Sequence, residues 1–179
     1  MNILFLNRTF YAPYTGGVAN SIFHLSNYYI SKGFNVYVIS ENTGSSMLQY
    51  DNEGLITIIR HPHYFKYLKP RENYLFIKWL TKFIEAEILR NKIDIVISRN
   101  LLYSYCLLKV DVPKIYYLPS LFPLESIEFM NNKDISIVKK IFLFLQSRLQ
   151  LHLEKTVIAK FSRIATLSEM RKKELIDYY

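Results

Sequence analysis

The sequence predicts a doubly wound α/β domain, with a mainly parallel, Rossmann-like sheet between two layers of helices. Short runs rich in β-branched and aromatic residues alternate with amphipathic helical segments along the whole chain. The chain has 179 residues, and 50% of them are hydrophobic, which suits a single domain with a substantial core. Glycine and proline are scarce, with 5 and 6 residues, so most of the chain is expected to be regular structure.

Six strands are expected along the chain. Residues 3–7 form a continuous apolar run, which is typical of a strand buried on both faces. The other predicted strands are residues 35–40, 55–60, 94–98, 114–118 and 163–167. Right-handed crossovers between parallel strands favour the spatial order 3-2-1-4-5-6, numbered along the chain. The polar segment 41–54 contains two glycines and is predicted to be a loop.

The segments between these strands have helical periodicity. Apolar residues follow Val18 at intervals of four, three and four residues through Tyr29, so they share one face of a helix. Gly33 stands just after this helix, in the left-handed position that ends many helices. Residues 72–91 also carry their apolar side chains on one side. The remaining helices are expected at residues 101–109, 135–160 and 169–179.

Composition narrows the class of protein. With 21% charged residues and a large apolar fraction, the chain is not intrinsically disordered. The single cysteine, Cys106, excludes a disulfide scaffold and fits a reducing compartment. The apolar runs are too short to span a membrane, and the first residues lack a signal peptide's basic start, so a cytoplasmic protein is expected. The net charge of +8 indicates an anionic partner: a nucleic acid, a membrane surface or a phosphorylated ligand.

A long loop after the first strand is the first candidate site. In the predicted order, the strands at 3–7 and 94–98 are neighbours, and a crevice opens at their carboxyl ends. The loop between Arg8 and Gly17 leads into that crevice and exceeds the usual length of about two to six residues. Gly16 and Gly17 allow positive φ and close approach of backbone amides to a ligand. The helix amino terminus favours a phosphate or carboxylate; the alternative is a glycine-rich turn without a ligand.

Arg99 and Asn100 follow the fourth predicted strand and are expected in the same crevice. An arginine there binds phosphate through two parallel hydrogen bonds; the alternative is a solvated surface arginine. The sequence contains neither the dinucleotide fingerprint G-x-G-x-x-G nor a Walker A motif, which argues against a nicotinamide or P-loop enzyme. His61 and His63 are spaced like two metal ligands, but the sequence offers no evident third ligand, so no metal is expected.

Several segments resemble glycosyltransferase family 4 (group 1). The first strand, the loop ending in Gly16-Gly17-Val18 and the helix ending in Lys32-Gly33 are similar to the opening of that family. The stretch KIDIVI at residues 92–97 resembles the family's fourth strand. The stretch FSRIATLSE at residues 161–169 resembles the segment near the end of its first domain. These similarities occur in the family's order and spacing across the whole chain.

The resemblance implies a GT-B architecture, in which two Rossmann-like domains enclose the active site. It implies a nucleotide-sugar donor as a substrate, with no metal and no other cofactor. Residues 1–179 are similar to the amino-terminal, acceptor-side domain alone. The donor-binding domain is therefore expected outside this chain, as a following domain or a partner subunit. The implied acceptor is a lipid-linked or cell-envelope saccharide, handled at the inner face of a membrane.

The resemblance also assigns roles to residues. Gly16 and Gly17 match the donor-phosphate loop. The acceptor side of the cleft is assigned Arg8, Arg99, Asn100 and Ser120. Many members carry a histidine after the fifth strand; here Pro119 occupies that place and has no hydrogen to donate, whereas Ser120 has a hydroxyl. No catalytic residue is assigned.

Residues 60–83 have the most unusual composition. These 24 residues include six lysines or arginines, one acidic residue and seven aromatic residues. Such a mixture suits an anionic membrane surface, where Lys66, Lys69 and Arg71 are expected to meet lipid head groups. Single-stranded nucleic acid suits the same mixture, although no nucleic-acid partner is expected, and the third alternative is an ordinary loop and amphipathic helix. A membrane role alone would make the chain a non-catalytic subunit that recruits a separate glycosyltransferase.

Overall fold

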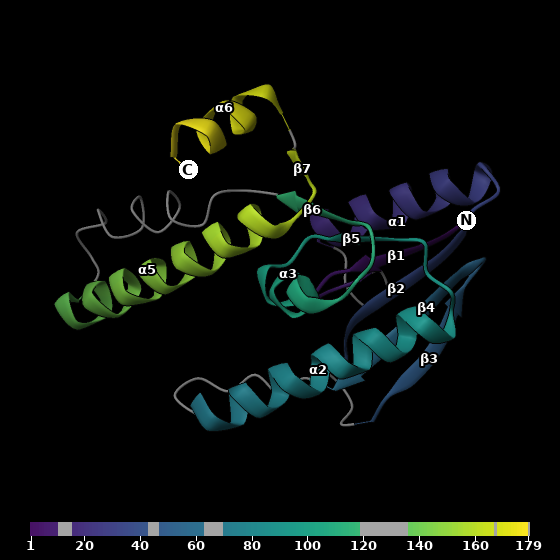
Figure 1. Ribbon diagram of the computed structural model, residues 1–179, viewed down its shortest axis with the longest axis horizontal. Helices are drawn as coiled ribbons and strands as arrows, with labels where there is room; N and C mark the ends of the chain where they lie inside the picture. Colours follow the sequence, from purple (N-terminus) through teal and green to yellow (C-terminus); the bar gives the residue numbers. More distant parts are fainter. Residues whose placement is uncertain (11–15, 43–46, 63–69, 119–135, 167, 179) are drawn as a thin grey trace.

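A seven-stranded sheet forms the centre of the protein, as the computed structural model shows (Figure 1). The structure describes residues 1–10, 16–42, 47–62, 70–118, 136–166 and 168–178. The strands are β1 (Asn2–Leu6), β2 (Asn35–Asn42), β3 (Gln49–Glu53), β4 (Ile56–Pro62), β5 (Ile95–Ser98), β6 (Lys114–Leu118) and β7 (Arg163–Thr166). Their spatial order is β3-β4-β2-β1-β5-β6-β7. Without β3 this is the predicted order, and all of those pairings are parallel.

Helices cover both faces of this sheet. They are α1 (Gly17–Ser31), α2 (Pro70–Arg90), α3 (Leu101–Cys106), the 3₁₀ turn η1 (Leu107–Lys109), α5 (Ile137–Lys160) and α6 (Glu169–Tyr178). Helix α1 packs on one face, and α2, α3 and the carboxyl-terminal half of α5 pack on the other (Figure 1). The three-layer αβα arrangement predicted from the sequence is therefore confirmed. In the part of the chain that the structure describes, no helix is long and apolar enough to cross a membrane.

Strand β1 is buried on both faces, as its continuous apolar run predicts. Ile3 and Phe5 pack in the core beneath α1, together with Ile22 of that helix. Leu4 and Leu6 belong to the opposite core, beneath α2 and α3. All four β1 side chains are at most 1% exposed. Burying each one contributes about 1.5–3 kcal/mol, so the centre of the sheet is rigidly anchored.

The predicted helix faces are largely correct. On α2, the apolar stripe from Phe76 through Leu80 and Ile84 to Ile88 is buried against the sheet. On α1, Ile22 is buried, whereas Val18 in the first turn is 39% exposed and does not belong to the core. Gly33 has φ +81° after the end of α1, which confirms its predicted left-handed conformation.

The prediction of a loop over residues 41–54 is wrong. Strand β2 continues to Asn42, and the polar sequence QYDNE forms β3, which pairs antiparallel with β4 at the edge of the sheet. An edge strand needs no buried face, so no apolar alternation marks it in the sequence. Tertiary contacts hold it instead: Tyr50 donates to Glu87 on α2 at 2.8 Å, and Arg60 on β4 pairs with Asp51 at 3.2 Å.

Two further differences concern residues 60–83. Arg60 and His61 are buried on β4, so neither contributes to a basic surface. Helix α2 begins at Pro70, a residue that suits a first helical turn because it lacks an N–H. Arg71, predicted to lie in a loop, therefore belongs to this helix.

Cys106 is the last residue of α3. Its side chain is buried, and its Sγ lies 3.9 Å from the carbonyl oxygen of Ile77 on α2. Burial raises the pKa of this thiol to about 11. The residue is a core side chain, as expected for a cysteine within an apolar helix.

Candidate functional site

The site predicted at the centre of the sheet lies where β1 and β5 end side by side. Leu6 and Ser98 are register partners at these ends, and both are buried. The next residue of the β5 loop, Arg99, donates its backbone N–H to the carbonyl of Leu6 at 3.0 Å. On the other side, the backbone N–H of Asn7 bonds to Ile39 of β2 at 3.2 Å. The connections after β1 and β5 run to opposite faces, so the strand order reverses here, the usual binding place in open α/β sheets.

Gly16 and Gly17 are both exposed at the amino terminus of α1. Gly16 is the N-cap residue, and its carbonyl accepts the first helical hydrogen bond, from the N–H of Asn20 at 3.0 Å. The amides of the first turn have no partner within a helix, and no side chain among the described residues caps them. Without a cap from the described residues, they present N–H groups and the positive end of the helix dipole to the sheet edge.

The expectation that these two glycines adopt positive φ is wrong. Gly16 has φ −72°, and the glycines with positive φ are Gly33 and Gly54. A β-carbon built on Gly16 or Gly17 would meet no other atom within 4 Å. Neither backbone conformation nor packing among the described residues therefore requires glycine at these two positions.

Arg8 lies at the end of β1, beside the end of β2. Its Nε donates to Oε2 of Glu41 at 3.0 Å, and its carbonyl accepts the backbone N–H of Glu41 at 3.0 Å. The Arg8 side chain is 60% exposed, whereas that of Glu41 is 5% exposed. The charge of Arg8 is thus balanced by a carboxylate that the sequence analysis did not identify.

Arg99 is buried rather than solvated, with 5% of the residue exposed. Its Nη1 donates to Oγ of Ser21 on α1, and its guanidinium carbon lies 4.3 Å from the ring centroid of Tyr117 on β6. Burial lowers the pKa of Arg99 from its ordinary value, an effect that Tyr117 partly opposes. Arginine nevertheless remains protonated in proteins, so a positive charge is held at the switch point.

Asn100 has a structural task at the start of α3. Its Oδ1 accepts the backbone N–H of Leu102 at 3.0 Å, which makes it the N-cap of this helix. Its carbonyl accepts hydroxyl hydrogen bonds from Ser98 and Ser104, at 3.2 and 3.0 Å. These bonds fix the turn that carries Arg99, and among the described residues the side-chain amide nitrogen of Asn100 has no hydrogen-bond partner.

Of the other predicted residues, Arg71 belongs to a different part of the fold. Arg71 is exposed on the first turn of α2. Ser120, Lys66 and Lys69 lie outside the residues that the structure describes. The site therefore brings together Arg8, Gly16, Gly17, Arg99 and Asn100 from the predicted set, all at the carboxyl edge of the sheet or the adjoining helix start.

Sequence reasoning missed Ser21 and Tyr117, the two residues that hold the Arg99 side chain. Ser98 is the register partner of Tyr116, so the next residues on, Arg99 and Tyr117, come to lie side by side. The predicted strand order makes these two strands neighbours. Their register, however, is set by tertiary packing and cannot be read from the hydrophobic pattern of the sequence.

His61 is not a metal ligand in the described part of the chain. The ring is fully buried, with Nδ1 2.9 Å from the carbonyl oxygen of Pro62 and Nε2 2.6 Å from Oη of Tyr103. Because a carbonyl only accepts, Nδ1 carries the proton toward Pro62, and Nε2 accepts the tyrosine hydroxyl. No group of three metal-binding side chains occurs among the described residues.

The parallel sheet, its strand order and the exposed helix start at its switch point define a Rossmann-like α/β domain. The chain belongs to Glycosyltransferase Family 4, whose profile matches residues 15–179. No curated protein is similar enough in sequence to match it.

Solved structures share this fold. Sucrose-phosphate synthase from Thermosynechococcus elongatus is similar over 99% of this chain and 45% of its own, with a TM-score of 0.74 and 10% identity. The E. coli trehalose-6-phosphate structure bound with UDP-2-fluoro glucose is similar over 99% and 42%, with a TM-score of 0.57 and 14% identity. An α,α-trehalose-phosphate synthase (UDP-forming) from Burkholderia vietnamiensis is similar over 99% of this chain and 42% of its own, with a TM-score of 0.55 and 13% identity. The chain thus spans less than half of each of these proteins and has the fold of an amino-terminal GT-B domain.

Proposed function

We propose that this chain, as a single domain over residues 1–179, is the acceptor-side half of a nucleotide-sugar-dependent glycosyltransferase. The observation that carries the proposal is the carboxyl edge of the sheet, where uncapped amides of α1 lie across from a buried arginine on the β5 loop. Such an edge is a binding surface for anionic and polar ligands. The membership in Glycosyltransferase Family 4 and a similar structure bound with UDP-2-fluoro glucose support a sugar nucleotide as the donor.

In this proposal the two halves of a cleft share the substrates. The amides at Gly16 and Gly17 approach the donor diphosphate and help to neutralise it as it leaves. Arg8, Arg99, Asn100 and Ser120 face the acceptor. A second Rossmann-like domain supplies the rest of the donor site, because this chain covers only 45% and 42% of the similar structures. That domain follows in the same polypeptide or is a partner subunit.

The test is a transfer assay with the two halves separated. The 179-residue chain alone is incubated with UDP-, GDP- and ADP-sugars and with extracted lipids or free sugars as acceptors, and product is followed by mass spectrometry. The protein that supplies the second domain is then added, or the longer polypeptide is used. We expect product only with both halves present, and no nucleotide release with this chain alone. Sugar transfer by the isolated chain, or none by the complete assembly with any donor, would contradict the proposal.

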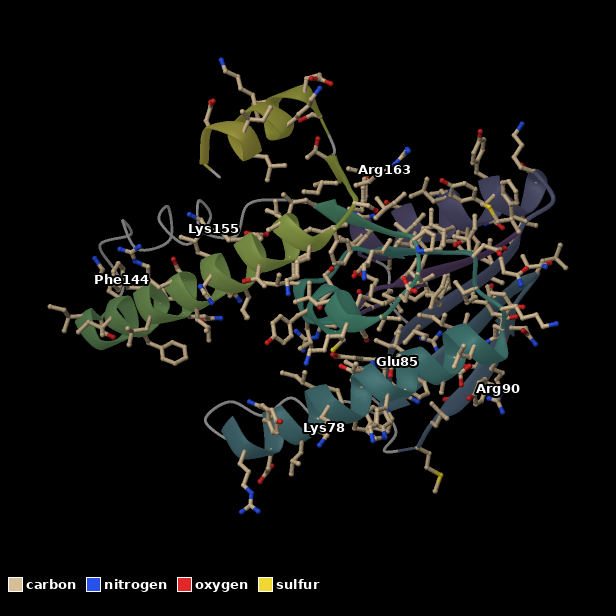
Figure 2. All side chains as sticks on the ribbon, in the orientation of Figure 1. Lys78, Glu85, Arg90, Phe144, Lys155 and Arg163 are labelled. Atoms are coloured by element: carbon tan, nitrogen blue, oxygen red, sulfur yellow. The ribbon has the colours of Figure 1, made fainter. Side chains whose placement is uncertain are left out.

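A specific surface feature favours a membrane role, either for this enzyme or for a non-catalytic recruiting subunit. The amino-terminal half of α5 extends away from the sheet (Figure 1). Ile137, Ile141, Leu145 and Leu149 form a stripe on it with a spacing of four residues, and each is more than half exposed. Figure 2 shows Phe144 on this extended part of the helix, where its ring lies 5.4 Å from the guanidinium carbon of Arg148.

Helix α2 adds exposed aromatic and basic residues. Tyr74, Leu75 and Trp79 are exposed on it, and so are the cations Arg71 and Lys78, the latter labelled in Figure 2. Apolar and aromatic side chains flanked by cations suit the interface of an anionic bilayer, where each cation contributes about 1 kcal/mol. We therefore propose that α2 and α5 rest on the inner membrane surface and that the acceptor is a lipid-linked or cell-envelope saccharide.

A further inference from the structure

Two arginines lie at the carboxyl edge of the sheet, and their charges are balanced differently. Arg8 forms an ion pair with Glu41 at 3.0 Å. Arg99 forms no ion pair with any described residue, although it is the more deeply buried of the two. A guanidinium has five N–H groups. In Arg99, Nη1 bonds to Ser21, and the buried Nε donates to no group of the described residues.

Tyr117 does not replace a counter-ion. The face of its ring lies against the guanidinium, which fixes the plane of the group and provides weak electrostatic attraction. A buried positive charge nevertheless needs a negative partner to offset the loss of hydration. Ser21 and Tyr117 hold the side chain in position, and no described residue compensates its charge.

One neighbour of Arg99, the amino-terminal end of α1, adds positive potential. Ser21, which accepts its hydrogen bond, lies about one turn along α1 from Gly17. The uncapped amides at the start of α1 therefore lie near the guanidinium and carry the positive end of the helix dipole. A buried cation and the start of α1 thus converge from two elements, and no acidic side chain in the described ranges lies between them.

We propose that Arg99 binds a phosphate oxyanion of a substrate in front of the amino terminus of α1, and that Arg8 does not have this role. The inference rests on the proposed function and specifies it: one substrate group at this edge is a phosphate held by Arg99. Two sources supply that chemistry, the diphosphate of the donor and a phosphate on the acceptor. The Tyr117 ring and the Ser21 hydroxyl act as positioning groups, because they set the plane and direction of the guanidinium.

The test measures anion binding by the 179-residue chain rather than sugar transfer. Inorganic phosphate, UDP and glucose 6-phosphate are titrated separately by calorimetry at matched ionic strength, with sodium chloride as the reference salt. We expect saturable binding that Arg99→Gln weakens at least tenfold and Arg99→Lys weakens less, since lysine keeps the charge but not the planar fork. A larger loss for UDP assigns the site to the donor, and a larger loss for glucose 6-phosphate assigns it to the acceptor.

Arg148→Gln is the matched control. This arginine also lies over an aromatic ring, that of Phe144, but it is exposed on α5, so its loss should change each dissociation constant by less than twofold. If Arg99→Gln does not fold by near-ultraviolet circular dichroism, Tyr117→Leu retains the charge, removes only the positioning ring and should weaken binding several-fold.

Equal affinity of the wild type and folded Arg99 variants, or no binding of any of the three anions, overturns this inference. That outcome is distinct from failure of the proposed function. Intact sugar transfer without phosphate binding at Arg99 would contradict the inference about Arg99 and leave the proposed function standing. Phosphate binding without transfer by the complete assembly would remove the glycosyltransferase proposal alone.

Discussion

The guanidinium of Arg8 and the carboxylate of Glu41 meet where β1 and β2 end, with Nε 3.0 Å from Oε2. The two partners differ strongly in exposure, because Arg8 is mostly in solvent and Glu41 is almost fully buried. Removal of either one therefore leaves a different residue behind. Loss of Arg8 takes a charged partner from a buried carboxylate, whereas loss of the Glu41 charge leaves an arginine that water solvates well.

This asymmetry predicts unequal effects on folding. Arg8→Ala should lower the free energy of unfolding by about 1–2 kcal/mol, because the buried carboxylate loses a charged partner. Glu41→Gln should lower it by about 0.5 kcal/mol or less, since the exposed arginine returns to water. Urea unfolding followed by circular dichroism measures both values. Equal losses, or a larger loss for Glu41→Gln, would show that the ion pair is not the main contact of Glu41.

Gly17→Ala should separate binding from folding. A β-carbon meets nothing within 4 Å there, and alanine favours a helix, so stability should stay unchanged or rise by up to about 1 kcal/mol. If a diphosphate approaches this backbone, the added methyl group should lower turnover of the complete enzyme at least tenfold. Thermal unfolding and steady-state kinetics are measured on the same preparation.

Gly33→Ala is the control for this experiment and should show the reverse pattern. Its φ of +81° is a conformation that alanine adopts only with strain, so stability should fall by about 1–2 kcal/mol. Turnover should stay near that of the wild type, because Gly33 follows the carboxyl end of α1, whereas Gly17 lies at the amino end. Unchanged kinetics in Gly17→Ala would leave the glycine pair without a role in donor binding.

Tyr103→Phe should destabilise the core. The Tyr103 hydroxyl donates to Nε2 of the buried His61 at 2.6 Å, and burial keeps the pKa of Tyr103 well above its ordinary value. The hydroxyl is therefore a neutral donor at all working pH values. Its removal takes the tyrosine hydrogen bond from a buried acceptor, at a cost of about 1–3 kcal/mol.

A double variant isolates this hydrogen bond. His61→Leu together with Tyr103→Phe removes both partners, and such replacements cost less than the sum of the single losses. Chemical unfolding of the wild type, the two single variants and the double variant gives the four free energies of this double-mutant cycle. Strictly additive losses would indicate that the 2.6 Å contact contributes nothing to stability.

Charge reversal at Lys66, Lys69 and Arg71 should abolish binding to anionic vesicles. Positive side chains near an anionic bilayer contribute about 1 kcal/mol each, and salt weakens this attraction by shortening the Debye length. Sedimentation with vesicles containing phosphatidylserine measures the bound fraction, and neutral vesicles should retain little protein. Equal binding of the wild type to anionic and neutral vesicles would contradict the proposed membrane surface.

The matched control reverses three exposed lysines elsewhere on the described surface, namely Lys32, Lys92 and Lys109. Both triple variants change the net charge by the same amount, so a difference between them reports the location of the charges rather than their number. We expect the control variant to bind anionic vesicles nearly as well as the wild type. Equal loss of vesicle binding in both triple variants would indicate that binding depends on the net charge of the protein and not on where the charges lie.

The fold was largely predictable because its information is local. The continuous apolar run of β1 and the 3.6-residue periodicity of α2 need no tertiary knowledge, and right-handed crossovers leave few possible strand orders. Strand β3 escaped prediction because its residues are stabilised by side chains of other elements, Tyr50 by Glu87 on α2 and Asp51 by Arg60 on β4. Such contacts leave no periodic signal in the sequence.

The site was predictable in position but not in detail. The switch point follows from strand order, so Gly16 and Arg99 were assigned to it from the sequence. The burial of Arg99 between Ser21 and Tyr117, and the neutralisation of Arg8 by Glu41, depend on register and side-chain packing. The extended backbone of Gly16, the residue before α1, in place of positive φ, likewise follows from where α1 begins.

Because its thiol is buried, Cys106 can report how often the native fold opens locally. It is the single cysteine in the sequence, and alkylating reagents react with the thiolate. With a pKa of about 11, only about one thiol in a thousand is ionised at pH 8, and the native fold shields it from reagent. Labelling therefore requires that the buried side of α3 becomes transiently exposed. The rate of maleimide incorporation then measures how often this opening occurs in each variant, and no probe has to be introduced.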